Sequence, residues 1–195
     1  MRILPADQEG ALDEAVRVIR EGGIVAHPTE TCYGLACDLT SAKAVDRLFN
    51  LKERPTHKLV STLFASVDAA KKYVEWNAKA EELAEKYLPG PLTIILPLKV
   101  PLHGWATLGV RISSSPFVQK LVKLAGVPLS TTSANIHGQP NPYSAADVVA
   151  QFTEKSLQPD LILDGGELPL APPSTVVEVR GGEVRVLRQG DLVIS

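Results

Sequence analysis

The chain has 195 residues, with 20 Lys and Arg against 22 Asp and Glu, a formal net charge of −2 and a pI near 6.1. This balance argues against a protein dedicated to nucleic-acid phosphates, for which a pI above about 9 is usual. No apolar run approaches the roughly 20 residues that span a bilayer, and the N-terminal residues lack the apolar stretch of a signal peptide. We therefore expect a soluble, cytoplasmic protein with no membrane partner.

The length fits a single domain covering residues 1–195, with enough chain to bury a core of its own. Cys32 and Cys37 are the two cysteines, and they lack a second pair or a nearby histidine at a zinc-like spacing. We expect both to be free, buried thiols in a reducing compartment.

Helices and strands alternate along the chain, as hydrophobic periodicity, helix caps and Gly or Pro breaks indicate. We predict helices over 11–21, from Ser41 to before Pro55, after the caps Ser66 and Asn77, over 117–124 with an end at Gly126, and from Ser144 to Phe152. We predict strands over 24–27, 59–65, 92–96, 108–112, 127–131, 161–163, 174–179 and 184–187. There is no strict βαβ rhythm, which favours an α/β or α+β domain.

The segment 165–173 contains glycines and prolines but no periodic pattern. A mobile loop and an ordinary surface turn both fit this composition.

Polar residues gather where predicted strands end. These junctions cover residues 28–35, 51–58, 109–111 and 130–135, and two later pieces, 173–177 and 187–190, add a hydroxyl and a guanidinium. In open α/β sheets, ligands bind in crevices beyond the carboxyl ends of strands. We therefore expect these junctions to meet at a binding cleft.

Each polar candidate also has a purely structural interpretation. Arg54 and Lys58 fit a solvated helix end as well as a phosphate contact, and the cluster 130–135 fits turn capping as well as a site. Arg111 lies in an apolar strand and needs a partner, which is either a ligand carboxylate or an internal acid. His27 and His57 fit general bases or structural histidines. The residues by themselves leave these alternatives open.

Motifs that would define a familiar nucleotide or metal site are absent from the sequence. It has no GxxxxGK[ST] loop, no GxGxxG fingerprint, no HExxH pair and no GxSxG elbow. The residues alone thus indicate an α/β enzyme with a polar, partly basic cleft.

Seven short motifs occur in a particular order along nearly the whole chain. They are residues 28–38 (PTETCYGLACD), Lys52-x-Arg54-Pro55, 89–93 (PGPLT), Val110-Arg111, 131–135 (TTSAN), 174–177 (STVV) and, closing the series, Arg188-x-Gly190. Together they resemble the YrdC-like threonylcarbamoyl-AMP synthases, in the short form that lacks an extra C-terminal domain. The resemblance implies a twisted, mixed β-sheet with flanking helices and a deep, concave cleft lined by positive charge.

The resemblance also implies a reaction. L-threonine, bicarbonate or CO₂ and ATP would give threonylcarbamoyl-AMP and pyrophosphate, and a separate transferase complex would move the threonylcarbamoyl group to tRNA. Enzymes of this kind are nucleotidyltransferases.

The family's functional positions carry over to this sequence residue by residue. The ATP contacts fall on Arg54, Lys58, Thr107, Ser133, Asn141 and Arg188, and the L-threonine contacts on Thr31, Arg111, Thr131 and Ser174. Arg54 and Lys58 would also act in catalysis, by stabilising charge on the phosphate. Mg²⁺ would arrive with ATP, held by the triphosphate and water and not by a protein metal site.

Two other functions fit the same fold. The chain could be a non-catalytic paralogue whose positive cleft binds RNA weakly, or a carbamoyl-transfer domain like that of larger hydrogenase-maturation proteins. The intact Thr29-Glu30-Thr31 and Ser133-Ala134-Asn135 segments favour the enzyme.

Overall fold

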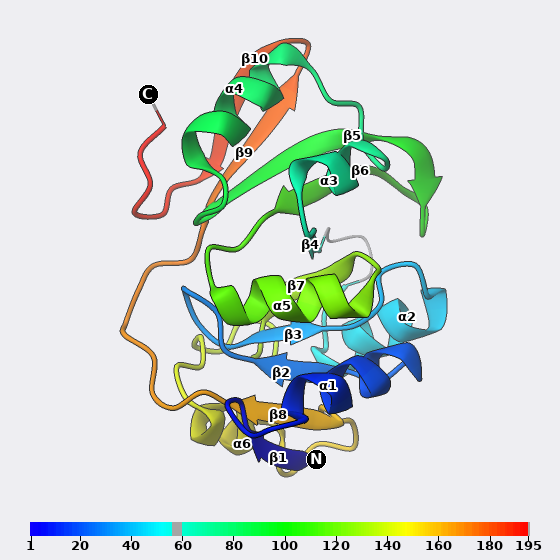
Figure 1. Cartoon of the computed structure of the whole chain (residues 1–195), viewed down its shortest axis with the longest axis vertical. Coiled ribbons are helices and arrows are strands. Elements are labelled where there is room, and N and C mark those ends of the chain that lie inside the picture. Colours follow the sequence, from blue (N-terminus) through cyan, green and yellow to red (C-terminus); the bar gives the residue numbers. More distant parts are fainter. Residues whose placement is uncertain (56–59, 195) are drawn as a thin grey trace.

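A single mixed sheet of ten strands organises the computed structural model, which describes residues 1–55 and 60–194. The strands are β1 (Arg2–Pro5), β2 (Val25–His27), β3 (Gly34–Ala36), β4 (Ser61–Leu63), β5 (Leu92–Leu102), β6 (Trp105–Arg111), β7 (Leu129–Ser133), β8 (Leu161–Asp164), β9 (Thr175–Arg180) and β10 (Glu183–Arg188). Their order is β1-β8-β2-β3-β7-β4-β6-β5-β9-β10, with both parallel and antiparallel neighbours (Figure 1). The predicted mixed sheet with flanking helices is confirmed.

Six helices connect these strands in the described part of the chain. They are α1 (Ala11–Arg20), α2 (Ala42–Leu51), α3 (Val67–Lys71), α4 (Ala78–Tyr87), α5 (Pro116–Ala125) and α6 (Ala145–Phe152). The four capping residues expected from the sequence, Ser41, Ser66, Asn77 and Ser144, each accept a hydrogen bond from a backbone N–H of the first turn. Gly126 ends α5 in the left-handed conformation, also as predicted.

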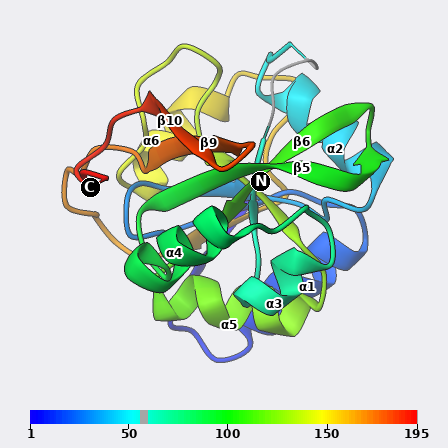
Figure 2. The same ribbon diagram turned by 90° about the horizontal axis from the view of Figure 1, so that it is seen from above.

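The helices cover both faces of the sheet (Figure 2). Helices α1 and α5 pack together on one face, in a cluster with side chains of β2, β7 and β8. Helices α2 and α6 belong to a second cluster, which takes the opposite side chains of β2 and β8, and α3 and α4 join it over β5 and β6. One face of β5 and β6 is thereby buried under helices, which leaves their other face to form a site.

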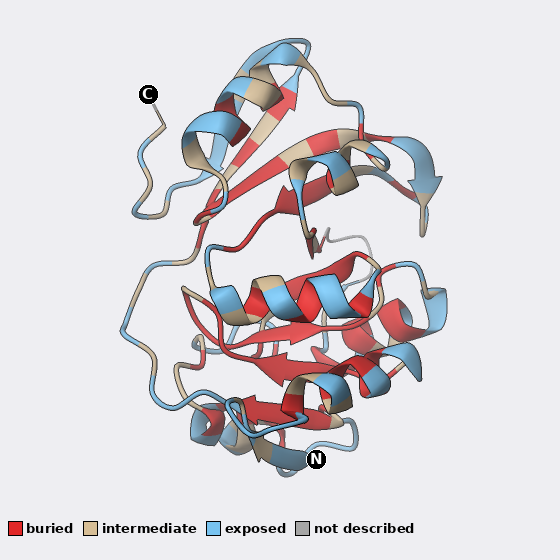
Figure 3. Ribbon diagram, in the orientation of Figure 1, coloured by how far each residue is buried: buried red, intermediate tan, exposed pale blue. Residues whose placement is uncertain are grey.

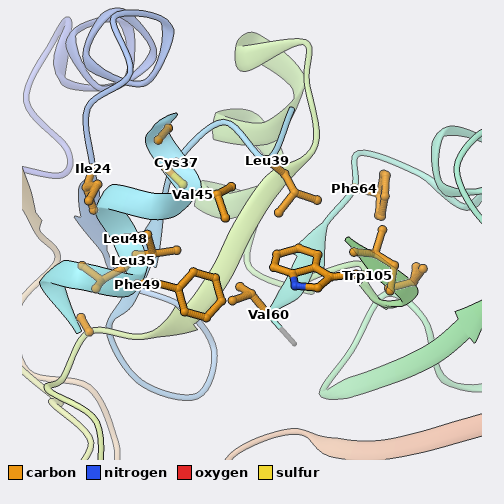
Figure 4. Packing of buried hydrophobic residues seen from close by; sticks show 14 of the residues in the cluster. Ile24, Leu35, Cys37, Leu39, Val45, Leu48, Phe49, Val60, Phe64 and Trp105 are labelled. Atoms are coloured by element: carbon orange, nitrogen blue, oxygen red, sulfur yellow. The ribbon is translucent and has the colours of Figure 1, made fainter. Parts of the chain in front are cut away.

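The strands are buried at the centre and exposed at the outer edge formed by β10 (Figure 3). Helix α2 is linked to β6 through the aromatic pair Phe49 and Trp105, whose ring centroids lie 6.1 Å apart (Figure 4). Val60 is in the same buried cluster, directly after the residues that the structure does not describe. This packing places the end of α2 beside the centre of the sheet.

Two strands were not expected from the sequence. Strand β1 is a four-residue edge strand with only one half-buried side chain, and β3 is a three-residue strand inside the PTETCYGLACD motif. Neither strand is long enough to show the alternation of apolar and polar residues by which a strand is predicted. Strand β5 also continues six residues beyond its predicted end at Leu96, through two prolines.

Cys32 and Cys37 are both free and buried, as predicted. None of the helices in the described residues combines the length and apolarity needed to cross a membrane.

Candidate functional site

A cavity of about 400 Å³ opens on the face of β6 that lies opposite α3 and α4, beside β3, β4 and β7. Eight of the predicted site residues line it: Thr31, Arg54, Arg111, Thr131, Ser133, Asn141, Ser174 and Arg188. The volume lies within the range of about 300–1,000 Å³ typical of small-molecule sites. Residues from distant motifs thus meet in one pocket.

The remaining predicted residues are Thr107 and Lys58. Thr107 lines a neighbouring groove of about 230 Å³, and Ile95 belongs to both hollows. Because side chains alternate along a strand, Thr107, Gly109 and Arg111 share one face of β6, so the groove continues the cavity along the sheet. Lys58 lies outside the described residues.

Arg111 projects from the end of β6 and is largely buried. Its Nη2 donates to Glu30 Oε1 at 2.8 Å and to Thr31 Oγ1 at 3.2 Å. Its Nε is buried and makes no hydrogen bond to any described residue. The sequence left open whether Arg111 meets an internal acid or a ligand; the internal acid is Glu30, and it engages only Nη2 of the guanidinium.

Glu30 is held as a carboxylate. Burial opposes its ionisation, but the charge of Arg111 and the hydrogen bonds from Ser113 and Arg111 outweigh burial and lower the pKa of Glu30. The Glu30 and Arg111 side chains are only 16% and 10% exposed, so water screens their attraction weakly.

The loop before β3 is fixed by Thr29. Its hydroxyl donates to Cys32 O at 2.6 Å and accepts from the backbone N–H groups of Thr31 and Cys32. A threonine that satisfies its own loop in this way holds a tight turn without regular secondary structure. Thr31 is therefore presented to the cavity by a closed, hydrogen-bonded loop.

The residues of the cluster 130–135 divide between the cavity and buried structural contacts. Thr131, Thr132 and Ser133 line the cavity, whereas Ser130, also in β7, is buried and donates to Cys37 Sγ at 3.3 Å. Asn135 leaves the strand and bonds Lys52 instead.

The side chain of Lys52 is buried at the end of α2. Its Nζ donates to the carbonyl of Ser133, to Asn135 O at 2.6 Å and to Asn135 Oδ1 at 3.0 Å. Burial and the neighbouring charge of Arg54 lower the pKa of Lys52 to about 7. Through these three acceptors Lys52 connects α2 to the loop after β7.

Arg54 lies two residues after Lys52 and also lines the cavity. Its Nη1 donates to Thr132 Oγ1 at 3.4 Å, and its backbone N–H bonds to Phe49 O at the end of α2. Burial lowers the pKa of Arg54. Arg54 is half-buried and lines the cavity, which favours a ligand contact over the solvated helix end that the sequence also allowed.

Ser174 and Arg188 line the cavity and bond each other. Arg188 donates through Nε and Nη2 to Ser174 O, and through Nη2 to Ser174 Oγ at 3.1 Å. The hydroxyl of Thr93 on β5 lies 3.1 Å from the same Ser174 Oγ. Arg111, Arg54 and Arg188 thus bring three guanidinium groups to one pocket, which suits a ligand of high negative charge.

Gly190 holds the chain after β10 close to the backbone around Ser174. A Cβ at Gly190 would lie 2.3 Å from Pro173 O and 2.9 Å from Thr175 N, both backbone atoms. We expect Gly190→Ala to lower the free energy of unfolding by about 1–3 kcal/mol, as overpacking does. Urea denaturation measures it, with Gly181→Ala as the control because a Cβ there meets open space and only backbone strain remains. Equal, small losses in the two variants would contradict the close approach.

The segment 165–173 is attached to the body at several points. The Tyr33 hydroxyl accepts from Gly165 N and donates to Gly166 O at 2.8 Å, and the Tyr143 hydroxyl donates to Ala171 O at 3.1 Å. The segment leads directly to Pro173 and Ser174 at the cavity. These bonds connect the wall of the pocket to the loop that carries Asn141.

His27 does not line the cavity. It is fully buried, and its Nδ1 lies 3.1 Å from Pro28 O. Burial lowers the pKa of His27 to about 4, so the ring is neutral at pH 7. A structural histidine fits these observations better than a general base. His57 lies outside the described residues.

The neutral state of His27 predicts a pH dependence of stability. Between pH 6.5 and pH 4 the unfolded chain binds a proton that folded His27 does not, so stability falls as the pH falls. From pH 7 to pH 5 the loss is about 2 kcal/mol for this group. Urea denaturation at both pH values should show a loss smaller by that amount in His27→Gln. Equal losses in the two proteins would contradict the assignment.

Sequence reasoning missed several residues of the site. It gave no role to Glu30, Thr29 or Lys52, although all three lie inside motifs that it singled out. For Lys52 the sequence did hold a signal. The lysine directly follows the apolar end of a predicted helix, where its ammonium would be buried and would need hydrogen-bond acceptors.

Comparisons with known proteins identify the family of this chain. The profile of the Sua5/YciO/YrdC family, described as "Telomere recombination", matches residues 17–190. The threonylcarbamoyl-AMP synthase of Pyrococcus abyssi is 36% identical over 194 residues, which cover 96% of this chain and 56% of that protein. The enzyme of the same name from Xanthomonas oryzae pv. oryzae (strain PXO99A) is 36% identical over 181 residues, 89% of this chain and 95% of that protein.

A solved structure extends the comparison to three dimensions. The crystal structure of P. abyssi Sua5 complexed with L-threonine has a TM-score of 0.87 and 35% identity, covering 94% of this chain and 55% of that one. This chain therefore spans a little over half the length of the P. abyssi protein and nearly all of the Xanthomonas one. The chain belongs to the Sua5/YciO/YrdC family.

Proposed function

We propose that this protein is an L-threonylcarbamoyladenylate synthase, a nucleotidyltransferase that makes threonylcarbamoyl-AMP and pyrophosphate from L-threonine, bicarbonate or CO₂, and ATP. The observation that carries the proposal is the gathering of Arg54, Arg111 and Arg188 with Thr31, Thr131 and Ser174 in one cavity. Relatives named threonylcarbamoyl-AMP synthase, and a related structure with L-threonine bound, support it.

Threonine is proposed to bind at the Arg111 end of the cavity. The guanidinium of Arg111 suits a carboxylate, since it offers N–H groups in a planar fork. The hydroxyls of Thr31, Thr131 and Ser174 are short and stiff partners for the amine and hydroxyl of the substrate. All three are buried, which excludes water from the bound amino acid.

ATP is proposed to bind toward Arg54 and Arg188, with Ser133 and Asn141 as further contacts. Both arginines line the cavity, and a guanidinium suits phosphate oxygens because it can donate two parallel hydrogen bonds. Arg188 donates to the neutral carbonyl and hydroxyl of Ser174, which leaves its positive charge to a phosphate. Thr107 would contact the nucleotide from the adjoining groove, and Lys58 would add a cation from the segment that follows Arg54.

The reaction needs two bond-forming steps. The neutral amine of threonine attacks the carbon of bicarbonate and gives the carbamate and water. A carbamate oxygen then attacks the α-phosphorus of ATP as the bond to pyrophosphate breaks. Arg54 and Lys58 would stabilise the charge on the transferring phosphate, and holding three reactants together would supply much of the rate.

Mg²⁺ is proposed to accompany ATP, held mainly by phosphate oxygens and water, as is usual for this ion. The residues described by the structure include no group of three His, Cys, Asp or Glu side chains placed to hold a metal. Threonylcarbamoyl-AMP is a reactive mixed anhydride, so a transferase complex acting on tRNA would consume it. A cytoplasmic location follows from the proposed chemistry, since ATP and tRNA are available there.

Pyrophosphate release tests the proposal. Release from ATP and bicarbonate should require L-threonine and should be much slower with L-serine. A folded protein with no threonine dependence would contradict the proposal. RNA binding that weakens steeply with salt, without turnover, would instead support the RNA-binding paralogue.

A further inference from the structure

We propose that Glu30 is a positioning residue for the threonine carboxylate: it fixes the guanidinium of Arg111 from behind and takes no part in proton transfer. This inference rests on the proposed function and deepens it. Nothing in the family motif assigns Glu30 more than a place in the sequence 28–31.

The contacts of Arg111 divide its guanidinium into a fixed part and a part left for a ligand. Nη2 is held by Glu30 Oε1 at 2.8 Å and by Thr31 Oγ1 at 3.2 Å. Nη1 makes no hydrogen bond to a described residue, and Arg111 lines the cavity. A side chain anchored through one nitrogen keeps its plane fixed, so a carboxylate meets a donor that is already oriented.

Glu30 is itself anchored to a rigid element. Its Oε2 accepts a hydrogen bond from the hydroxyl of Ser113, which also accepts from the backbone N–H of Ser115, the capping residue of α5. Gln119 in α5 donates to the Ser113 carbonyl at 2.6 Å. Continuous hydrogen bonds therefore link α5 through Ser113 and Glu30 to Arg111 at the cavity.

Glu30 also compensates the buried positive charge of Arg111. Arg54, Arg111 and Arg188 line the cavity, and Glu30 is the carboxylate that contacts one of them. Without it, Arg111 would be a buried cation with no carboxylate within hydrogen-bonding distance among the described residues, and a buried cation of this kind is unfavourable. Both carboxylate oxygens of Glu30 are engaged by donors, which favours a counter-ion and not a base that must accept a further proton.

The test is the steady-state kinetics of Glu30→Gln, with pyrophosphate release as the readout. The amide keeps the shape of the side chain but removes its charge and offers one acceptor oxygen where the carboxylate offers two. We expect the KM for L-threonine to rise about 10-fold, in line with the strength of a charge-assisted contact, with kcat within about twofold and an unchanged KM for ATP. Titration calorimetry with L-threonine should show the same loss of affinity.

Two further variants separate positioning from folding and from catalysis. Ser113→Ala keeps both charges and removes one anchor, so the KM for threonine should rise by a smaller factor, and by almost none in the Glu30→Gln background. Glu30→Asp keeps the charge and should recover part of the affinity. Glu81→Gln makes the same Glu-to-Gln change in a more exposed ion pair, with Lys71 outside the cavity, and is the control that should leave the KM for threonine unchanged.

The outcomes are distinguishable. If Glu30→Gln turned over at least 100-fold more slowly at unchanged KM, or lost the acidic limb of the pH profile, Glu30 would be the base and the proposal would be overturned. An unchanged KM for threonine in Glu30→Gln would also overturn it. If Glu30→Gln does not fold, an unchanged KM in Ser113→Ala decides against it. Absence of threonine-dependent turnover in the unaltered protein would instead count against the proposed function.

Discussion

Arg111→Ala is expected to lower kcat/KM for L-threonine by about 100-fold or more. Truncating one partner of a buried, hydrogen-bonded charge pair costs about 2–5 kcal/mol, and every 1.4 kcal/mol is a factor of ten. The loss should lie mainly in binding of threonine, because Arg111 is the guanidinium that Glu30 and Thr31 hold at the buried end of the cavity. Threonine-dependent pyrophosphate release over a range of threonine concentrations measures it.

The kcat/KM of Arg111→Lys for L-threonine should lie between the values of the unaltered protein and of Arg111→Ala, since lysine keeps the charge and loses the planar guanidinium. The matched control is Arg47→Ala, which breaks the Arg47–Asp160 ion pair away from the cavity. The control should lower stability without changing the KM for threonine. An Arg111→Ala protein that is folded by circular dichroism and keeps the original KM for threonine would contradict the role of Arg111.

Lys52→Met is expected to have the largest effect on stability. The substitution removes the Nζ donor from the carbonyls of Ser133 and Asn135, whereas the side-chain oxygen of Asn135 keeps the Ser133 hydroxyl as a donor at 2.6 Å. Buried acceptors without a partner cost about 1–3 kcal/mol each, so for the two carbonyls we expect a loss of about 2–6 kcal/mol. Turnover should also fall, because the hydrogen bonds of Lys52 hold Ser133 in place and Lys52 lies two residues before Arg54, and both neighbours line the cavity. Urea denaturation and pyrophosphate release measure the two effects.

The control for Lys52 lies on the surface nearby. Lys155→Met breaks the exposed pair with Glu53, the residue next to Lys52, and should change stability by less than about 0.5 kcal/mol. If Lys52→Met unfolded at the same urea concentration as Lys155→Met and kept full turnover, Lys52 would not be the tie between α2 and the loop after β7.

Local signals in the sequence predicted much of the fold. The sequence identified four helix caps, because a short polar side chain just before a helical pattern of apolar residues can accept a hydrogen bond from a first-turn N–H. These caps are Ser41, Ser66, Asn77 and Ser144. Strand β3 was missed for the converse reason. Its three residues, Gly34–Ala36, gain their order from pairing with β2 and β7, and that pairing is not visible in the local pattern.

The sequence could indicate which residues gather at the cavity, but not the contacts that they make with one another. The resemblance to a known family named eight residues that the structure brings together in one cavity. It could not show that Arg111 meets Glu30, because they are 81 positions apart and only the sheet brings them together. Nor could it show that Thr107 lies in the adjoining groove, since that depends on how far along β6 each hollow extends.

The most direct test of the proposed function is the mass of the adenylate formed from ATP, L-threonine and ¹³C-labelled bicarbonate. We predict threonylcarbamoyl-AMP that carries a single ¹³C atom, in an amount equal to the pyrophosphate released. An adenylate without the label, or pyrophosphate release with no threonine-containing adenylate, would contradict the account.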